Sequence, residues 1–287
     1  MKFVSINLAL AVLLIASSCE KKESTEVDNT PTPGPAVELP VEDSSSAQAT
    51  DDNKSSGVYK GTFVGSSGSF KLVIQSDEIS GKLIVDGTGY LLTTTDISAS
   101  DLGSAINNAL FKDASETVRV FFSVDANGEN PSAQVSINGH ENIQVDVVKE
   151  TSSNHVKVYE GLLYYSYGDS FNVYQCVFNA NMVIKGNQGT TAVTYKYNSS
   201  NNIEGNSDCD TEDFGTINDY EYTINNNQIN AFTYVTECDS CPPMIEGFLD
   251  INTNGTFSNE SIFFESESWM TPSGMTLQDS VRFIRKL

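Results

Sequence analysis

The chain has 287 residues, of which 38 are acidic and 16 are basic, and its formal net charge is −22. A field of this sign repels phosphate backbones, so the composition argues against a nucleic-acid partner. The length is sufficient for one large or two small folded domains.

The first 18 residues have the features of an export signal. An apolar stretch runs from Leu8 to Ala16 and is followed by two serines and then Cys19. Small residues after a short apolar segment are typical of a secretory signal peptide and its cleavage site. The stretch is too short to cross a hydrocarbon core as a helix, which needs about 20 residues. We therefore expect residues 1–18 to be removed.

The segment Ala16-Ser17-Ser18-Cys19 resembles the lipobox of bacterial lipoproteins, although it has Ala16 where leucine is commonest. The resemblance implies that Cys19 is acylated and becomes the first residue of the mature chain. Several acyl chains, at about 0.8 kcal/mol per buried CH₂, would hold the protein firmly on a membrane. The resemblance implies a lipid-anchored protein at the outer membrane or cell surface, facing the periplasm or the exterior.

Residues 19–56 contain prolines 31, 33, 35 and 40 and many Ser, Asp and Glu residues, with little that is apolar. A segment of this composition cannot bury enough apolar surface to fold by itself. We expect it to be a disordered tether between the lipid and the folded part.

The remaining chain predicts an all-β fold with two tandem antiparallel β domains of meander or barrel-like type, residues 57–150 and 151–287. Apolar and polar residues alternate in many short segments, as expected of strands with one buried face. Asp86-Gly87, Asn127-Gly128, Asn138-Gly139 and Asn254-Gly255 each predict a hairpin turn. A single continuous barrel or sandwich is the alternative.

One short helix is expected, at about residues 101–111. Apolar residues recur there at helical spacing: Leu102, Ala105, Ile106, Ala109 and Leu110.

A short repeat at an offset of 100 residues supports two related domains. Gly57-Val58-Tyr59-Lys60-Gly61 corresponds to Lys157-Val158-Tyr159-Glu160-Gly161. Strand-rich units of this size that begin Tyr-x-Gly loosely resemble lipocalin-like small barrels. That resemblance implies a carrier function, but a fold by itself does not establish a function.

The second domain contains four cysteines, Cys176, Cys209, Cys238 and Cys241. In an exported protein an even number predicts disulfides, here with three pairings open. We favour Cys176 with Cys209 and Cys238 with Cys241. A redox-active Cys-x-x-Cys and a four-cysteine zinc site are alternatives that the spacing supports less well.

No cofactor is expected, although one segment has the opening pattern of a calcium loop. Asp250, Asn252 and Asn254 offer oxygen ligands at alternate positions before a glycine, and Glu260 follows near the end of the loop. The hairpin turn at Asn254-Gly255 is the simpler interpretation of the same residues.

The sequence favours a protein that is not an enzyme. Neither His140 nor His155 lies in a catalytic motif, and no spacing singles out a pair of carboxylates. Tyrosines and phenylalanines between Tyr159 and Phe178 are more typical of a strand core than of a stacking surface. We expect a lipid-anchored envelope protein with a binding or scaffolding role toward an envelope protein or a glycan. A carrier of a small apolar ligand, or a glycan-acting hydrolase, are the alternatives.

Overall fold

The computed structural model describes the backbone of residues 37–65, 67–168, 173–197, 214–225, 228–232, 253–257, 261–265, 269–270 and 276–287. After Leu162, side chains are described only at 179–187, 223–225, 228, 261–262 and 284–287. The described residues form strands, turns and one 3-10 turn at Ala49–Asp51. The prediction of an all-β fold is therefore confirmed.

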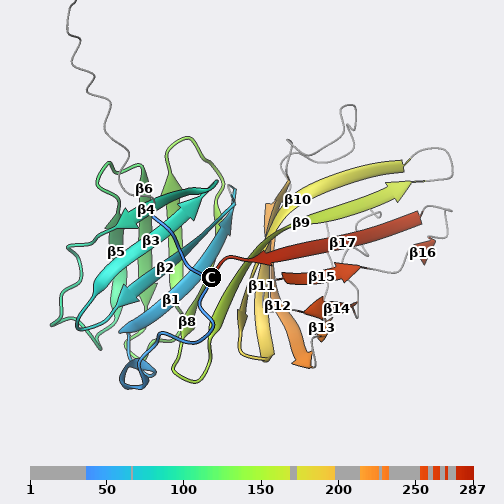
Figure 1. Cartoon of the computed structure of the whole chain (residues 1–287). Helices are drawn as coiled ribbons and strands as arrows, with labels where there is room; N and C mark the ends of the chain where they lie inside the picture. Colours follow the sequence, from blue (N-terminus) through green and yellow to red (C-terminus); the bar gives the residue numbers. More distant parts are fainter. Residues whose placement is uncertain are drawn as a thin grey trace, which may run out of the picture. The chain divides into compact units, whose positions relative to one another are not determined.

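Residues 57–150 form two antiparallel sheets, of five and three strands (Figure 1). The five-stranded sheet has the order β4-β3-β2-β1-β8, and the three-stranded sheet has the order β5-β6-β7. The strands are β1 Gly57–Val64, β2 Gly68–Ile74, β3 Ile79–Val85, β4 Thr88–Leu92, β5 Ile106–Lys112, β6 Val118–Val124, β7 Ser132–Ile137 and β8 Gln144–Glu150.

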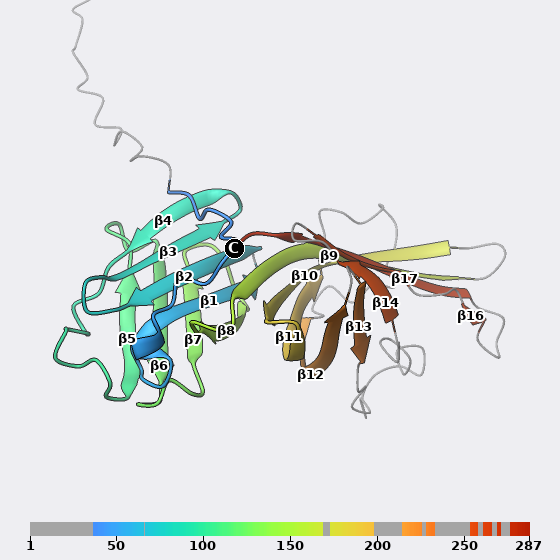
Figure 2. The ribbon, with the colours of Figure 1, turned by 60° about the horizontal axis from the view of Figure 1, so that its bottom comes forward.

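The strands after β8 form one antiparallel sheet that closes on itself (Figure 2). They pair in chain order from β9 to β15, and β17 then pairs with both β15 and β9. Among the described strands, β16 pairs only with β17, which leaves eight strands in the closed ring. The strands are β9 Val156–Gly168, β10 Val173–Lys185, β11 Gln188–Tyr197, β12 Phe214–Asn225, β13 Gln228–Phe232, β14 Thr253–Phe257, β15 Ser261–Glu265, β16 Trp269–Met270 and β17 Thr276–Arg285.

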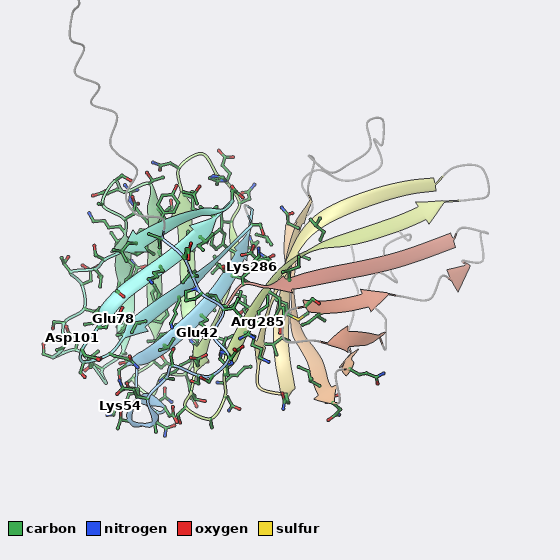
Figure 3. The ribbon with its side chains drawn as sticks, in the orientation of Figure 1. Glu42, Lys54, Glu78, Asp101, Arg285 and Lys286 are labelled. Carbon is green, nitrogen blue, oxygen red and sulfur yellow. The ribbon has the colours of Figure 1, made fainter. Side chains whose placement is uncertain are left out.

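Residues 37–47, which we call the strap, cross the outer face of the five-stranded sheet (Figure 3). Val37 contacts Gly89 of β4. Glu42 then contacts Lys71 of β2 and Lys60 of β1. Ser46 contacts Glu150 of β8. Residues 49–51 then form the 3-10 turn that leads to β1. The prediction of a disordered tether as far as Ser56 is therefore wrong for residues 37–56, because polar side chains of the sheet bind this segment.

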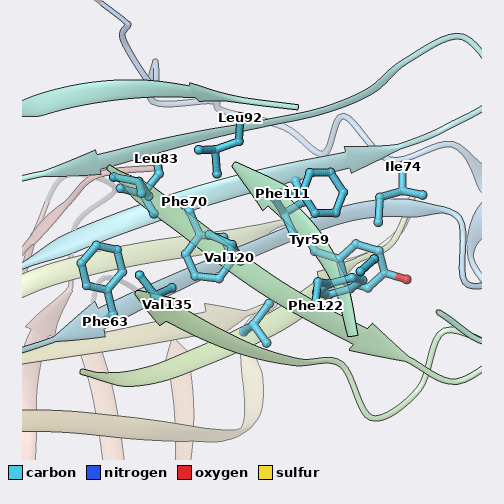
Figure 4. Close-up of a cluster of buried hydrophobic side chains, with 14 of the residues drawn as sticks. Tyr59, Phe63, Phe70, Ile74, Leu83, Leu92, Phe111, Val120, Phe122 and Val135 are labelled. Carbon is cyan, nitrogen blue, oxygen red and sulfur yellow. The ribbon is translucent and has the colours of Figure 1, made fainter. Parts of the chain in front are cut away.

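Two apolar clusters lie on opposite faces of the five-stranded sheet. The larger cluster fills the space between the five-stranded and three-stranded sheets, with Tyr59, Phe63, Phe70, Phe111 and Phe122 all buried (Figure 4). The smaller cluster lies on the outer face and joins the strap to the ring, and its members are Leu39, Ile84, Val148, Val156, Val158, Val183 and Leu287. Both faces of this sheet are thus covered.

The helix expected at residues 101–111 is absent from the described structure, and β5 begins at Ile106 instead. The register of β5 against β6 shifts between Ile106 and Ala109, and Asn108 within this bulge has a φ of 53°. The extra residue places Ile106, Ala109 and Phe111 on the buried face. Because of the bulge, Ile106 and Ala109 are three residues apart and yet lie on the same face, as they would in a helix. This spacing explains the wrong prediction.

The four expected hairpin turns have different outcomes. Asp86-Gly87 is confirmed as a two-residue turn, since Val85 and Thr88 pair directly and both turn residues have positive φ. Asn127-Gly128 lies in the longer connection between β6 and β7, and Asn138-Gly139 connects β7 to β8 in another sheet. Asn254-Gly255 lies inside β14, where Asn254 pairs with Asn230, so the hairpin expected there is wrong.

Candidate functional site

A buried lysine lies between two carboxylates where the strap crosses β1. Lys60 points to the outer face of the sheet, and none of its side chain is exposed. Its Nζ lies 2.7 Å from Glu150 Oε2 and 2.9 Å from Glu42 Oε2, and it donates to the Val156 carbonyl at 3.2 Å. The two acids come from the strap and from the end of β8, so the cluster joins segments far apart in the sequence.

Both oxygens of Glu150 accept several hydrogen bonds. The backbone N–H of Val156 donates to Oε2 at 2.9 Å, and the backbone N–H of Ser46 donates to Oε1 at 2.9 Å. Burial alone would raise the pKa of Glu150, but the hydrogen bond and charge of Lys60 hold it below its usual value. Glu150 is therefore an ionised, fully bonded carboxylate.

Glu42 neutralises two lysines that face each other across neighbouring strands. Lys60 of β1 and Lys71 of β2 are register partners, and like charges in that position repel. Lys71 Nζ donates to Glu42 Oε1 at 2.5 Å, while Glu42 Oε2 contacts Lys60. Burial would raise the pKa of Glu42, but these two lysines lower it. The strap thus supplies the charge that this part of the sheet requires.

His155 completes a group with metal-ligand chemistry. Ligand atoms of Glu42, Glu150 and His155 all lie within 4.8 Å of one another, the single such group among the described residues. The Lys60 ammonium bonds to both carboxylates and so already supplies the cation of this group. Burial and the charge of Lys60 lower the pKa of His155, which disfavours a second charge there. The arrangement acts as a clasp for the strap, and its carboxylates are not available as a general acid and base.

A second lysine fixes the 3-10 turn that follows the strap. Lys149 Nζ donates to the carbonyls of Asp51, at 2.7 Å, and of Asp52 and Lys54, and it lies 5.9 Å from the centre of the Tyr59 ring. Lysine side chains that donate to several carbonyls hold a turn in place much as a bound cation would. Two buried lysines therefore attach residues 42–54 to the sheet.

The strap also contacts the end of the ring. The Arg285 guanidinium donates from Nη2 to the Glu42 carbonyl and from Nε to the Leu287 carbonyl at 3.0 Å. Its Nη1 lies 3.7 Å from Asp43 Oδ1. Arg285 is the last residue of β17, so these contacts connect the strap to the closing strand.

Apart from Lys157, the side chains that β9 and β10 place inside the ring are apolar or aromatic as far as they are described. Val158 and Val183 pack toward the strap and the five-stranded sheet. Because strand side chains alternate, Tyr159, Ala180, Met182 and Ile184 point to the opposite face, into the ring. Each of these four is at most 1% exposed. This end of the ring is filled by apolar side chains and one tyrosine.

The structure places few of the residues that the sequence singled out. Cys176 lies in β10, while Cys19 and the three other cysteines lie outside the described residues. Asn254 lies in β14, while Asp250, Asn252 and Glu260 lie outside them too. The disulfides and the calcium loop therefore stay predictions. Sequence reasoning missed Lys60, Glu42 and Glu150, because nothing in the sequence signals which acidic residues meet a given strand lysine.

Comparison of the chain with protein-family models, with curated proteins and with solved structures found no match. Within the described part of the chain, no helix is long and apolar enough to span a membrane.

Proposed function

We propose that this protein is a lipid-anchored cell-envelope protein with a non-enzymatic binding or scaffolding role. The lipobox-like segment that ends at Cys19 supports the anchor. The observation that carries the proposal is the clasp, in which Lys60 binds Glu42 and Glu150. A segment that only links a lipid to a domain does not need buried ion pairs. With the strap attached to the sheet, only residues 20–36 separate Cys19 from the folded part, so the anchor would hold the folded part close to the membrane.

The anchor is tested by expression of the full chain in a Gram-negative host, followed by membrane fractionation and intact mass. We expect the wild-type protein to begin at an acylated Cys19 and to fractionate with membranes. Cys19→Ser should be soluble or unprocessed, whereas the control Ser18→Ala, which keeps a small residue before the cysteine, should behave as wild type. Equal behaviour of Cys19→Ser and wild type would refute the anchor.

A carrier function is the second candidate, and the closure of the second sheet favours it. An antiparallel ring of eight strands has an interior that either fills with side chains or holds one small ligand. The described side chains of β10 inside the ring, Ala180, Met182 and Ile184, are apolar, as the site of an apolar ligand requires. Native mass spectrometry of the protein purified from its host is the test. A bound mass that is extracted by organic solvent supports the carrier, and its absence supports a scaffold.

A further inference from the structure

We propose that Asn138 is a modification site, at which the chain spontaneously loses ammonia and gains a negative charge as aspartate or isoaspartate. The inference compares the two Asn-Gly pairs whose side chains the structure describes, Asn127-Gly128 and Asn138-Gly139. Hydrogen bonds hold the reacting groups of the first pair, while those of the second are free. The proposal goes beyond the anchor and the binding role, and it depends on neither.

The reaction needs an asparagine side chain and the backbone nitrogen of the next residue. This nitrogen gives up its proton and attacks the side-chain carbonyl carbon, Cγ, so that a bond forms between the two atoms. The bond from Cγ to the side-chain nitrogen then breaks, and ammonia leaves with that proton. Water opens the resulting cyclic imide at either of its carbonyls, which gives aspartate or isoaspartate. A following glycine favours the attack, because its backbone rotates most freely and no Cβ shields its nitrogen.

At Asn127-Gly128 all the reacting groups are held. Asn127 Nδ2 donates to Glu129 Oε2 at 2.8 Å, and Asn127 Oδ1 accepts from the backbone N–H of Glu129 at 3.2 Å. The Gly128 N–H donates to the Asp125 carbonyl at 2.9 Å. Gly128 is also buried, so close to Lys149 that an added Cβ would overlap its Nζ. Attack at this pair therefore requires several hydrogen bonds to break and a packed loop to open.

At Asn138-Gly139 the same groups are free. Both residues are exposed, and neither the Asn138 side chain nor the Gly139 N–H has a hydrogen-bond partner among the described residues. A Cβ added to Gly139 would meet nothing within 4 Å. The His140 N–H donates to the Ile137 carbonyl at 3.1 Å, and Gly139 has a φ of 84°, as the second central residue of a type II turn does. Types I and II differ by rotation of the central peptide, so this peptide can turn toward the side chain while the closing hydrogen bond stays.

The first measurement uses the full wild-type chain, incubated at mildly alkaline pH in buffer and, in parallel, in urea. Mass spectrometry of proteolytic peptides follows the conversion of Asn138 and Asn127. The rates in urea give the intrinsic reactivity of the two sequences, so the ratio of rates in buffer is divided by the ratio in urea. We expect this quotient to favour Asn138 at least about tenfold, because attack at Asn127 first requires its hydrogen bonds to break. A quotient near unity, or no conversion of Asn138 in buffer, would overturn the inference.

The second measurement identifies the product and uses two matched variants. We expect isoaspartate at position 138, because only the cyclic imide leads to it, whereas direct hydrolysis of the side chain by water gives aspartate alone. Aspartate without isoaspartate would therefore refute the attack by the Gly139 nitrogen. Asn138→Gln should stop the conversion in its peptide, since the longer side chain would have to close a larger ring. Asn127→Gln should leave the rate at Asn138 unchanged, and equal conversion in the two variants at position 138 would also contradict the proposal.

Discussion

The Lys60 ammonium lies 2.7 Å from Glu150 Oε2, and neither side chain has any exposed surface. Loss of one partner from such a pair leaves an uncompensated buried charge, which costs about 3–5 kcal/mol. We therefore expect Lys60→Ala to lower the free energy of unfolding by that amount, as measured by urea denaturation. Lys82→Ala is the matched control, because Lys82 continues the same cross-strand row but is exposed. A loss below 1 kcal/mol in Lys60→Ala would contradict the importance of the clasp.

The strap should open separately when its apolar contact is removed. Leu39 is 8% exposed and packs in the outer cluster, whereas Val41 in the same strap is 51% exposed. We expect Leu39→Ala to cost about 2–3 kcal/mol locally and to speed hydrogen exchange in residues 37–47. Val41→Ala should leave that exchange rate unchanged. Faster exchange throughout β1 and β2 in Leu39→Ala would show that the strap and the sheet unfold together.

Gly128 and Gly139 allow the cost of backbone strain to be distinguished from the cost of a steric overlap with Lys149. Gly128 and Gly139 have φ of 81° and 84°, but only at Gly128 would a Cβ overlap Lys149 Nζ and the Lys54 carbonyl. Alanine at either position costs about 1–2 kcal/mol through its left-handed backbone. Gly128→Ala should cost about 1–3 kcal/mol more, because it displaces Lys149. Equal melting temperatures of the two variants would refute the role of Lys149 in holding the 3-10 turn.

Asp146 on β8 should make the fold less stable as the pH rises. Its Oδ2 is buried without a partner among the described residues, and burial raises its pKa from 3.8 to about 6. The unfolded chain therefore loses this proton first, and the folded state loses stability between about pH 4 and pH 6. Asp146→Asn removes that loss, which is at most about 3 kcal/mol. Urea unfolding at pH 4 and pH 8 measures it, with the exposed Asp77→Asn as control.

The carboxylates of the clasp respond in the opposite direction. The pKa values of Glu42 and Glu150 are lowered from 4.5, so their contribution is complete above that pH and is lost as the pH falls further. We expect the protection of the strap amides against hydrogen exchange, relative to their intrinsic rates, to fall below about pH 4, where the contribution of protonated Asp146 is at its maximum. An acid-insensitive strap would contradict the ionic basis of the clasp.

The alternation of apolar residues predicted the strands well, because each strand buries one face. Asp86-Gly87 predicted its turn since both residues accept positive φ. The same reasoning failed at the bulge around Asn108, because an inserted residue changes the alternation of buried and exposed side chains locally. The ordered strap was not predictable from composition. Its few apolar residues hold it on the sheet only together with the ion pairs that Glu42 forms with Lys60 and Lys71. Those partners are distant in sequence and depend on the sheet register.

The strap also sets how far the folded part can move from an anchored Cys19. A flexible coil of residues 20–56 would have a root-mean-square span of about 35 Å, whereas one of residues 20–36 has about 23 Å. The accessible volume falls about threefold, because it varies with the cube of the span. If Cys19 carries the proposed lipid, attachment of Val37 to Gly89 on the β4 edge would therefore keep the folded part closer to the lipid surface. A partner on that surface would meet it more often, while one far above the membrane would be out of reach.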